Sequence, residues 1–368
     1  MRYIHELPDW PKFSWDDKQL SQIIGTARYK QGLLVGKLRS LGFDICAEAG
    51  FETLALDVVK SSEIEGEMLD MGQVRSSLAR RLGIKHVESV CVSKKVEGVV
   101  EMLIDATQKY EIPLTEQRIL HWHTMLFSGK GSHPLRIGSW RTEKDGAMQV
   151  VSGYYGHEKV HFEAPAAERL ESEIGRFIEW CNADLSLDPI IRAGIAHLWF
   201  VIIHPLEDGN GRIARAIADY MLAKADGLPQ RFYSMSAQLE HERNAYYEIL
   251  ERIGKGSMDI TQWLVWFIGC FERSIEASEK TLEQVLVRAH VWKHAVEYPL
   301  NDRQRKVLVR LLDNFEGKLT SSKYAKLAKC SSDTALRDIK EMVEYNILKQ
   351  GEAGGRSTSY VLTQTSDE

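Results

Sequence analysis

The stretch HPLEDGNGRIAR, residues 204–215, concentrates groups that could hold an anion and move a proton. Gly209 and Gly211 flank Asn210, and such glycines let successive backbone N–H groups converge. We expect a helix to begin near Asn210, which would add unpaired N–H groups and the positive end of the helix dipole. The stretch therefore predicts an anion seat of the kind that binds phosphate.

Charged and titratable side chains surround this predicted seat. Arg212 and Arg215 are three apart, so they share a face of the helix, and guanidinium groups bind phosphate oxygens through paired hydrogen bonds. Asp208 is a natural ligand for a Mg²⁺ ion that bridges two phosphates. His204, with an ordinary pKa of about 6.5, could take a proton from a hydroxyl at neutral pH. These groups could transfer a nucleotide's phosphate group to an alcohol.

The same residues have ordinary structural interpretations. A histidine after an apolar helix is usually structural, GNG is usually a turn, and arginines three apart are usually solvated. Their coincidence within residues 204–215 makes a purely structural explanation less favoured. His204 and Asp208 are also four apart, which leaves a metal hydrolase as an alternative, although no third ligand is obvious. His121 and His123 diverge on a helix and do not predict a metal pair.

The composition is that of an ordinary globular chain. Its 368 residues suffice for two or three domains, and 44% are hydrophobic and 27% charged. The net charge of −5 argues against a protein built as a whole to coat nucleic acid. Five scattered cysteines argue against a disulfide framework and favour a reducing cytoplasm. The first residues contain no apolar run, so we expect no secretory signal there, and the longest apolar run is too short to span a membrane.

Helical periodicity dominates the first 298 residues. The expected helices cover about residues 16–42, 51–82, 87–110, 166–182, 189–203 and 240–298, with further helix starts at Thr115 and Asn210. The helix from Asn210 is expected to end at Gly227. The short segments AMQVVSG and KVHFEA flank residues 154–156 and predict a β-hairpin.

After Pro299 the pattern changes to three short helices and two strands. The helices are expected at 303–314, 321–329 and 332–345, and the strands at 347–350 and 359–362, around residues 352–356. This order is typical of a winged helix-turn-helix. Basic residues on and beyond the expected recognition helix could form a patch that touches DNA phosphates; they are Arg337, Lys340, Lys349 and Arg356. Acidic residues nearby weaken this basic patch; they are Asp333, Asp338, Glu341 and Glu344. Binding of duplex DNA and a protein-interacting or dimerising role both stay open.

HPLEDGNGRIAR resembles the signature of the Fic (Fido) family, His-x-Phe-x-Asp/Glu-Gly-Asn-Gly-Arg-x-x-Arg. Leu206 stands where Phe is usual, and Leu can serve as the same apolar anchor. The resemblance extends over about residues 110–275, including the stretch GSWR at 138–141 and the hairpin. Family members typically transfer AMP from ATP to a hydroxyl of a target protein and release pyrophosphate.

The resemblance implies a role for each residue of the motif. His204 would be the base, and Asp208 would hold Mg²⁺. The implied nucleotide-binding residues are Gly209, Asn210, Gly211, Arg212 and Arg215, with the arginines on the β- and γ-phosphates. Tyr246 and Tyr247 fall in the family's base-binding region, although they could equally be core aromatics. The hairpin, about residues 147–162, would act as a flap that adds a strand to the target.

A second motif, SSEIEGE at residues 61–67, lies in the N-terminal part. One interpretation is a capping box formed by Ser62 and Glu65. The apolar spacing nevertheless lets one helix run straight through, with Glu65 in mid-helix and Gly66 costing about 1 kcal/mol relative to Ala. A glycine kept at that cost suggests the close approach of another backbone.

Ser61-x-x-x-Glu65-Gly66 resembles the inhibitory motif of class II Fic proteins, whose brake helix precedes the catalytic core. The N-terminal part, with DWPKFSWD, also resembles the domain found with them. The resemblance implies that Glu65 pairs with Arg215 and occupies the place that the γ-phosphate needs. In some such proteins the inhibitory Glu also positions a water that removes AMP, which would be a second activity.

The sequence therefore predicts a mainly α protein in three parts. A helical N-terminal domain with the inhibitory motif covers 1–109, a Fic-type core with a small hairpin flap covers 110–298, and a winged helix-turn-helix covers 299–368. We expect an autoinhibited, cytoplasmic protein adenylyltransferase. It would use ATP and Mg²⁺ to modify a Ser, Thr or Tyr hydroxyl of a target protein or of itself. The alternative is a DNA-binding transcriptional regulator whose Fic core senses a nucleotide. A homodimer is left open.

Overall fold

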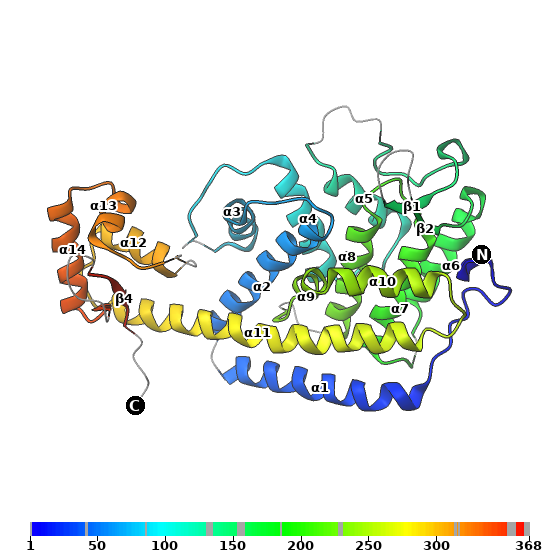
Figure 1. The fold of residues 1–368 in the computed structure, drawn as a ribbon, viewed down its shortest axis with the longest axis horizontal. Helices are drawn as coiled ribbons and strands as arrows, with labels where there is room; N and C mark the ends of the chain where they lie inside the picture. The colour runs from blue at the N-terminus through cyan, green and yellow to red at the C-terminus, as the bar shows by residue number, and fades with distance from the viewer. Residues whose placement is uncertain are drawn as a thin grey trace. The chain divides into compact units, whose positions relative to one another are not determined.

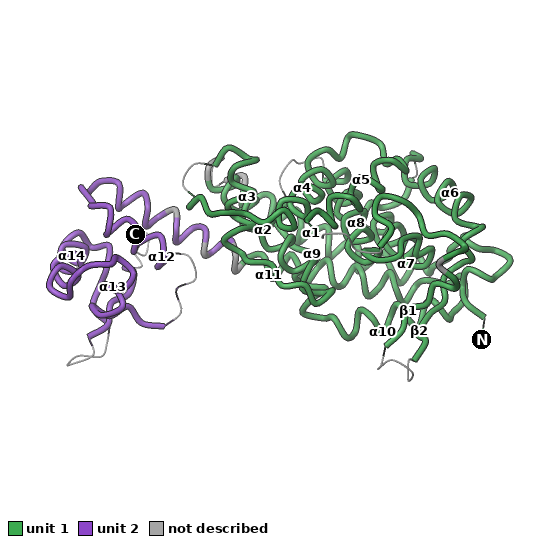
Figure 2. The backbone as a smooth tube through the Cα atoms, turned by 90° about the horizontal axis from the view of Figure 1, so that it is seen from above, with its two compact units in different colours: residues 1–281 green, residues 282–368 purple. Residues whose placement is uncertain are grey.

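A computed structural model of the protein describes residues 2–40, 43–84, 87–129, 135–152, 159–184, 186–226, 231–312, 315, 317–351 and 358–363. The chain divides into two compact units, residues 1–281 and 282–368, and each is described by itself (Figure 2). The predicted boundaries after residues 109 and 298 lie inside the first and second unit respectively, so the predicted division into three domains stays a prediction. The fold is mainly helical, as the periodicity predicted.

The first unit begins with a short 3-10 helix, Ile4–Glu6, which is followed by four α-helices (Figure 1). They are α1 (Asp17–Ser40), α2 (Phe43–Ile64), α3 (Met71–Leu82) and α4 (Lys94–Gln108). Helix α1 lies alongside the first part of α11 (Thr261–Ala295). Lys30 of α1 forms ion pairs with Glu272 and Glu276 of α11. No helix in the described part of the chain combines the length and apolar character that crossing a bilayer requires.

The prediction of one continuous helix through the SSEIEGE motif was wrong. Helix α2 ends at Ile64, and α3 begins only after Asp70, whose side chain accepts a hydrogen bond from the Gln73 backbone N–H at 2.8 Å. The Ser62–Glu65 capping box was also wrong, because Ser62 lies in the last turn of α2. Gly66 has φ +76°, and a Cβ built on it would meet nothing within 4 Å. The glycine is therefore needed for its left-handed backbone and not for the close approach of another chain segment.

Gly66→Ala is expected to lower the free energy of unfolding by about 1 kcal/mol, because a Cβ strains the left-handed conformation without meeting a neighbour. Gly66→Asn is the matched control, since Asn tolerates this conformation better. Thermal unfolding of both variants measures the difference. A loss for Asn equal to that for Ala would contradict a purely backbone role.

Six helices form the middle of the unit. They are α5 (Glu116–Leu126), α6 (Leu170–Asn182), α7 (Pro189–Ile203), α8 (Asn210–Asp226), α9 (Met235–His241) and α10 (Arg243–Gly254). The predicted cap at Thr115 is confirmed, because its side chain accepts from the Arg118 N–H at 3.1 Å. Helices α7 and α8 pack side by side and are buried along most of their lengths (Figure 1). The predicted helical stretch 240–298 is interrupted at Glu242 and at residues 255–260, and Gly227 lies outside the described residues.

The predicted hairpin is present as β1 (Gln149–Ser152) and β2 (Lys159–Glu163). The strands pair antiparallel, with Gln149 opposite Glu163 and a register irregularity between Val150 and Val151. Its predicted turn, residues 154–156, lies outside the described residues. His161 Nδ1 lies 2.6 Å from Glu251 Oε2 in α10, so the second strand is tied to the helical body.

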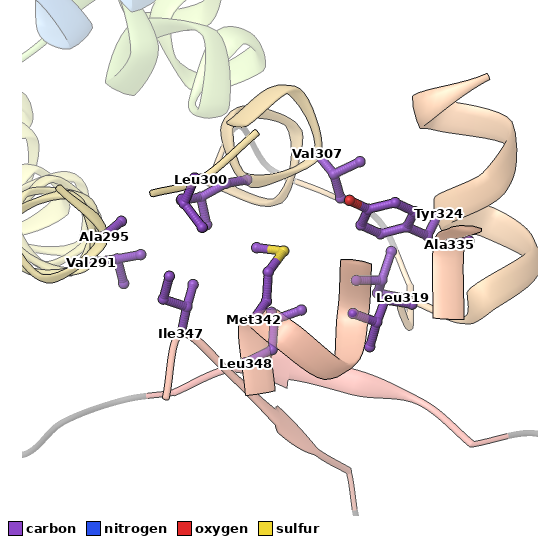
Figure 3. Packing of buried hydrophobic residues seen from close by; sticks show 12 residues of the cluster. Val291, Ala295, Leu300, Val307, Leu319, Tyr324, Ala335, Met342, Ile347 and Leu348 are labelled. Carbon is purple, nitrogen blue, oxygen red and sulfur yellow. The ribbon is translucent and has the colours of Figure 1, made fainter. Parts of the chain in front are cut away.

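The second unit contains α12 (Asp302–Leu312), α13 (Ser321–Ala328), α14 (Ser332–Glu344), β3 (Leu348–Gln350) and β4 (Tyr360–Leu362). The two strands pair antiparallel. Helices α12, α13 and α14 pack around a core that includes Val307, Tyr324 and Met342 (Figure 3). Residues 352–356, with Arg356, lie outside the described residues. The elements occur where they were expected, and their assignment as a winged helix-turn-helix stays a prediction.

Candidate active site

The motif loop runs between the end of α7 and the start of α8. His204 closes α7 in a left-handed conformation (φ 47°, ψ 58°), and its N–H donates to the Phe200 carbonyl at 3.0 Å. Leu206 is fully buried, as expected of an apolar anchor. Gly209, with φ +84°, then turns the chain into α8, which begins at Asn210 as predicted. The loop is thus fixed at both ends by secondary structure.

The Asn210 side chain binds the loop's own backbone. Its Oδ1 accepts from the Leu206 N–H at 3.0 Å, and its Nδ2 donates to the Leu206 carbonyl at 2.8 Å. Only 3% of Asn210 is exposed. The amide side chain therefore clamps the loop, which leaves the backbone N–H at this position to contribute to the anion seat.

The His204 ring is held in its neutral form. Its Nδ1–H donates to the Val201 carbonyl at 3.2 Å, so Nε2 carries the lone pair of the neutral ring. Burial lowers the pKa of His204 to about 4, and the Arg141 guanidinium also lowers it, against the opposing effect of the Val201 hydrogen bond. This pKa lies below the ordinary value near 6.5, so the ring is neutral throughout the physiological range.

Arg141 was not assigned a role from the sequence, although it lies in the GSWR stretch. Its Nε donates to the His204 carbonyl at 2.8 Å and its Nη2 to the Pro165 carbonyl at 2.5 Å. Its backbone N–H donates to the Pro205 carbonyl at 2.9 Å. Because Arg141 is 3% exposed, these bonds rigidly hold the backbone that carries His204.

Arg215 is buried and bound by the SSEIEGE motif. Its Nη2 donates to Glu65 Oε1 at 2.8 Å and to the Ser61 carbonyl at 2.9 Å, and its Nε donates to Ser61 Oγ at 3.0 Å. With 2% exposure it is not the solvated arginine of the structural interpretation. Burial alone would raise the pKa of Glu65, but the charges of Arg215 and Arg212 outweigh it, and that pKa is lowered. Glu65 is therefore an anion at neutral pH.

The Glu65 carboxylate lies against the first turn of α8. A Cβ built on Gly211 would fall 2.3 Å from Glu65 Oε1, closer than any real contact. A side chain at this position would therefore displace the Glu65 carboxylate. The carboxylate thus occupies the helix N-terminus where the sequence predicted an anion seat.

Arg212 faces a different carboxylate. Its Nη1 lies 2.5 Å from Glu67 Oε2 and its Nη2 lies 3.6 Å from Asp208 Oδ1, while the guanidinium carbon is 5.3 Å from the centre of the Phe127 ring. Arg212 is 3% exposed, whereas the Asp208 side chain is 46% exposed. Glu67 was missed, although an acid two residues after Glu65 could have indicated it.

The two tyrosines lie in different environments. Tyr246 is 1% exposed, and its hydroxyl shares a hydrogen bond of 2.8 Å with His197 Nε2, which favours the interpretation as a core aromatic. Tyr247 is 40% exposed, and its hydroxyl lies 3.5 Å from the Ile64 carbonyl at the end of α2. Tyr247 alone of the pair is open to a base, and that role stays a prediction.

The metal-hydrolase alternative gains no support from the geometry. Within the described ranges, no three His, Cys, Asp or Glu side chains lie together as a ligand set for a metal ion. His123 is fully buried and its Nδ1 accepts from the Gly138 N–H at 3.0 Å, while His121 on the same helix is exposed. The two histidines diverge, as predicted.

The site therefore combines a helix N-terminus, two buried arginines and a neutral histidine, a set suited to phosphate chemistry. Residues 113–222 match the model of the Fic/DOC family, and residues 3–84 match a domain of unknown function, DUF4172. The chain thus contains a Fic/DOC domain, and the motif loop with His204 and α8 lies inside it.

Named relatives and a solved structure resemble longer parts of the chain. The chain is 29% identical over 229 residues to protein adenylyltransferase Fic of Nematostella vectensis, a match that covers 60% of this chain and 47% of that protein. It is 28% identical over 223 residues to the protein of that name from Drosophila yakuba, covering 60% and 40%. The matches thus span less than half of these relatives.

A crystal structure of a Fic family protein from Desulfovibrio desulfuricans G20 superposes with a TM-score of 0.56 at 17% identity. The superposition covers 97% of this chain and 99% of that one. It shows that the two chains share a fold.

Proposed function

We propose that the protein is an adenylyltransferase that moves AMP from ATP to a hydroxyl of a protein. The observation that carries the proposal is that Arg212 and Arg215 lie buried in the first turns of α8, directly after the loop that holds His204 in its neutral form. Such a seat suits a triphosphate, and the histidine suits deprotonation of an alcohol. The relatives named protein adenylyltransferase Fic support the same activity.

In the proposed reaction, the target's hydroxyl oxygen attacks the α-phosphorus, and the bond from that phosphorus to the bridging oxygen of pyrophosphate breaks. His204 Nε2 takes the hydroxyl proton, and pyrophosphate leaves with the electron pair. Arg212 and Arg215 balance its negative charge. Arg141 keeps His204 in place through the backbone.

Asp208 fits a magnesium ligand in this proposal. Its carboxylate is 46% exposed and lies next to the seat, and Mg²⁺ in such sites is bound by one or two carboxylates together with substrate phosphates. The ion, when bound, neutralises phosphate charge.

The proposal includes autoinhibition by Glu65. Its support is the 2.8 Å contact with Arg215 and the position of the carboxylate against Gly211. ATP could then bind only with its terminal phosphates displaced from the seat, since two anions cannot share it. Ser61, Glu65 and Gly66 act as one unit, because Ser61 binds the same guanidinium and Gly66 sets the turn.

Transfer of label from ATP tests this function. Protein carrying Glu65→Gly is incubated with Mg²⁺ and ATP labelled on the α-phosphate or on the γ-phosphate. The proposal expects α-label on protein, including self-modification visible as added AMP by mass spectrometry. Label only from the γ-phosphate would indicate a kinase. ATP binding without any transfer would favour a nucleotide sensor.

DNA binding by the second unit is a second proposal, favoured by one observation. Asp338, one of the acids expected to weaken the basic patch, is 1% exposed and accepts from Arg303 and from the Tyr324 hydroxyl inside the unit. Arg337 and Lys340 on α14 are exposed. A mobility shift of duplex DNA by the full chain that weakens steeply with salt would support this role, and no shift at low salt would oppose it.

A further inference from the structure

The segment between α2 and α3 directs two carboxylates, not one, at the arginines of α8. Glu65 reaches Arg215 at 2.8 Å, and Glu67 reaches Arg212 at 2.5 Å. We propose that Glu67 is a second inhibitory residue that competes with the phosphates of ATP for Arg212. The inference rests on the proposed function in one respect, namely that these arginines receive the triphosphate.

The surroundings of Arg212 support competition rather than simple solvation. Its side chain is 3% exposed, and Glu67 takes its Nη1 while Asp208 lies beside its Nη2. The face of its guanidinium is turned toward Phe127. A phosphate that binds Nη1 of this guanidinium would therefore have to displace the Glu67 carboxylate, because two anions at one guanidinium repel each other.

The backbone makes the two contacts a single device. Within the turn, the Glu65 N–H donates to the Ser62 carbonyl at 3.1 Å, and the Glu67 N–H donates to the same carbonyl at 3.0 Å. Gly66, with φ +76°, lies between the two acids. Because residues 65–67 form one hydrogen-bonded turn at the end of α2, a single displacement of that turn would withdraw both carboxylates from the arginines, while Ser61 would still contact Arg215.

Lys95 on α4 gives Glu67 an alternative partner. Lys95 Nζ lies 3.3 Å from Glu67 Oε2, the same oxygen that contacts Arg212. When a phosphate binds Arg212, the Glu67 carboxylate could therefore leave that arginine and remain paired with the Lys95 ammonium group. This predicts that Lys95→Met has the opposite effect to Glu67→Gln, because Lys95→Met removes a positive charge that would stabilise the released carboxylate.

The test measures the affinity of the full chain for Mg·ATP by calorimetry, with Glu65→Gly as the reference so that Glu65 does not mask the effect. Adding Glu67→Gln is expected to tighten binding about tenfold, as for one removed charge competitor. The KM for ATP should fall with it, while kcat stays near the reference. Adding Lys95→Met to the reference should weaken binding, and should do so much less when Glu67→Gln is also present.

Glu63→Gln is the matched control. It removes the same charge one turn earlier, where Glu63 pairs with Lys60 and not with the arginines, and it should leave the affinity unchanged. Glu67→Ala removes the carboxylate without leaving an amide, and it serves if Glu67→Gln unfolds.

The outcomes separate this inference from the proposed function. Unchanged or weaker ATP binding after loss of the Glu67 carboxylate would overturn the inference, even if AMP transfer occurs. Tighter binding without any AMP transfer would support the role of Glu67 and overturn the adenylyltransferase proposal. Tighter binding with a lower KM would support both.

Discussion

Glu65→Gly is expected to raise AMP transfer by about a hundredfold or more. The substitution removes a carboxylate whose interaction with a buried partner, worth about 3–5 kcal/mol, competes with the phosphates of ATP. Loss of one partner from a buried pair normally destabilises a protein, since the other charge is left alone. Here Arg215, 2% exposed, would instead receive phosphate. Removal of Glu65 also clears the space beside Gly211, where its Oε1 lies. The substitution should therefore act on the orientation of ATP more than on folding.

The measurement is incorporation of α-labelled AMP into protein, with ATP affinity determined in parallel. Glu65→Gln is a useful second variant, because it keeps the volume of the side chain and removes its charge. Glu63→Gln is again the control, with its ion pair to Lys60. If the Glu65→Gly protein bound ATP and transferred no more AMP than the parent, the proposed autoinhibition would be wrong.

His204→Ala is expected to abolish detectable transfer in the Glu65→Gly background, a loss of about a hundredfold to ten-thousandfold for a general base. ATP binding should persist, because the proposed contacts to the triphosphate come from Arg212, Arg215 and the α8 N-terminus. The ring is neutral at pH 7, since burial lowers its pKa to about 4. The loss should therefore appear in kcat rather than in affinity.

His121→Ala is the matched control for this change, because His121 is exposed on α5 and contributes nothing to the proposed seat. It should leave transfer unaffected. Substantial transfer by the His204→Ala variant would mean that another group accepts the proton, and the mechanism proposed here would have to be abandoned.

The elements of the fold could largely be predicted from local signals. The cap at Thr115, the hairpin and the start of α8 each depend on residues close in sequence. The break between α2 and α3 could not, because apolar residues continue at helical spacing through it. Met68 belongs to that pattern and is 75% exposed, whereas Ile64 is fully buried. The spacing of apolar residues alone does not reveal that α2 ends before Gly66, which adopts a left-handed conformation, and that a new helix begins at Met71.

The candidate site divides in the same way. The contact between Glu65 and Arg215 could be anticipated only through a resemblance, because 150 residues separate them. The roles of Arg141 and Glu67 depend on backbone and side-chain groups brought near by the fold, and no local pattern encodes them. The sequence placed Asn210 in the loop, but it did not indicate that its side chain bonds the Leu206 backbone, and its nucleotide-binding role stays a prediction.

The tight contact at Gly211 has a consequence for substitutions at this position. A side chain here would force the Glu65 carboxylate to move, and in the proposed active form it would lie beside the phosphates that replace that carboxylate. A substitution here would therefore disturb the proposed inhibitory contact and the proposed substrate site together. A substitution in the turn of residues 65–67 would change the inhibitory contact alone, so the strength of inhibition can be adjusted there without altering the motif loop.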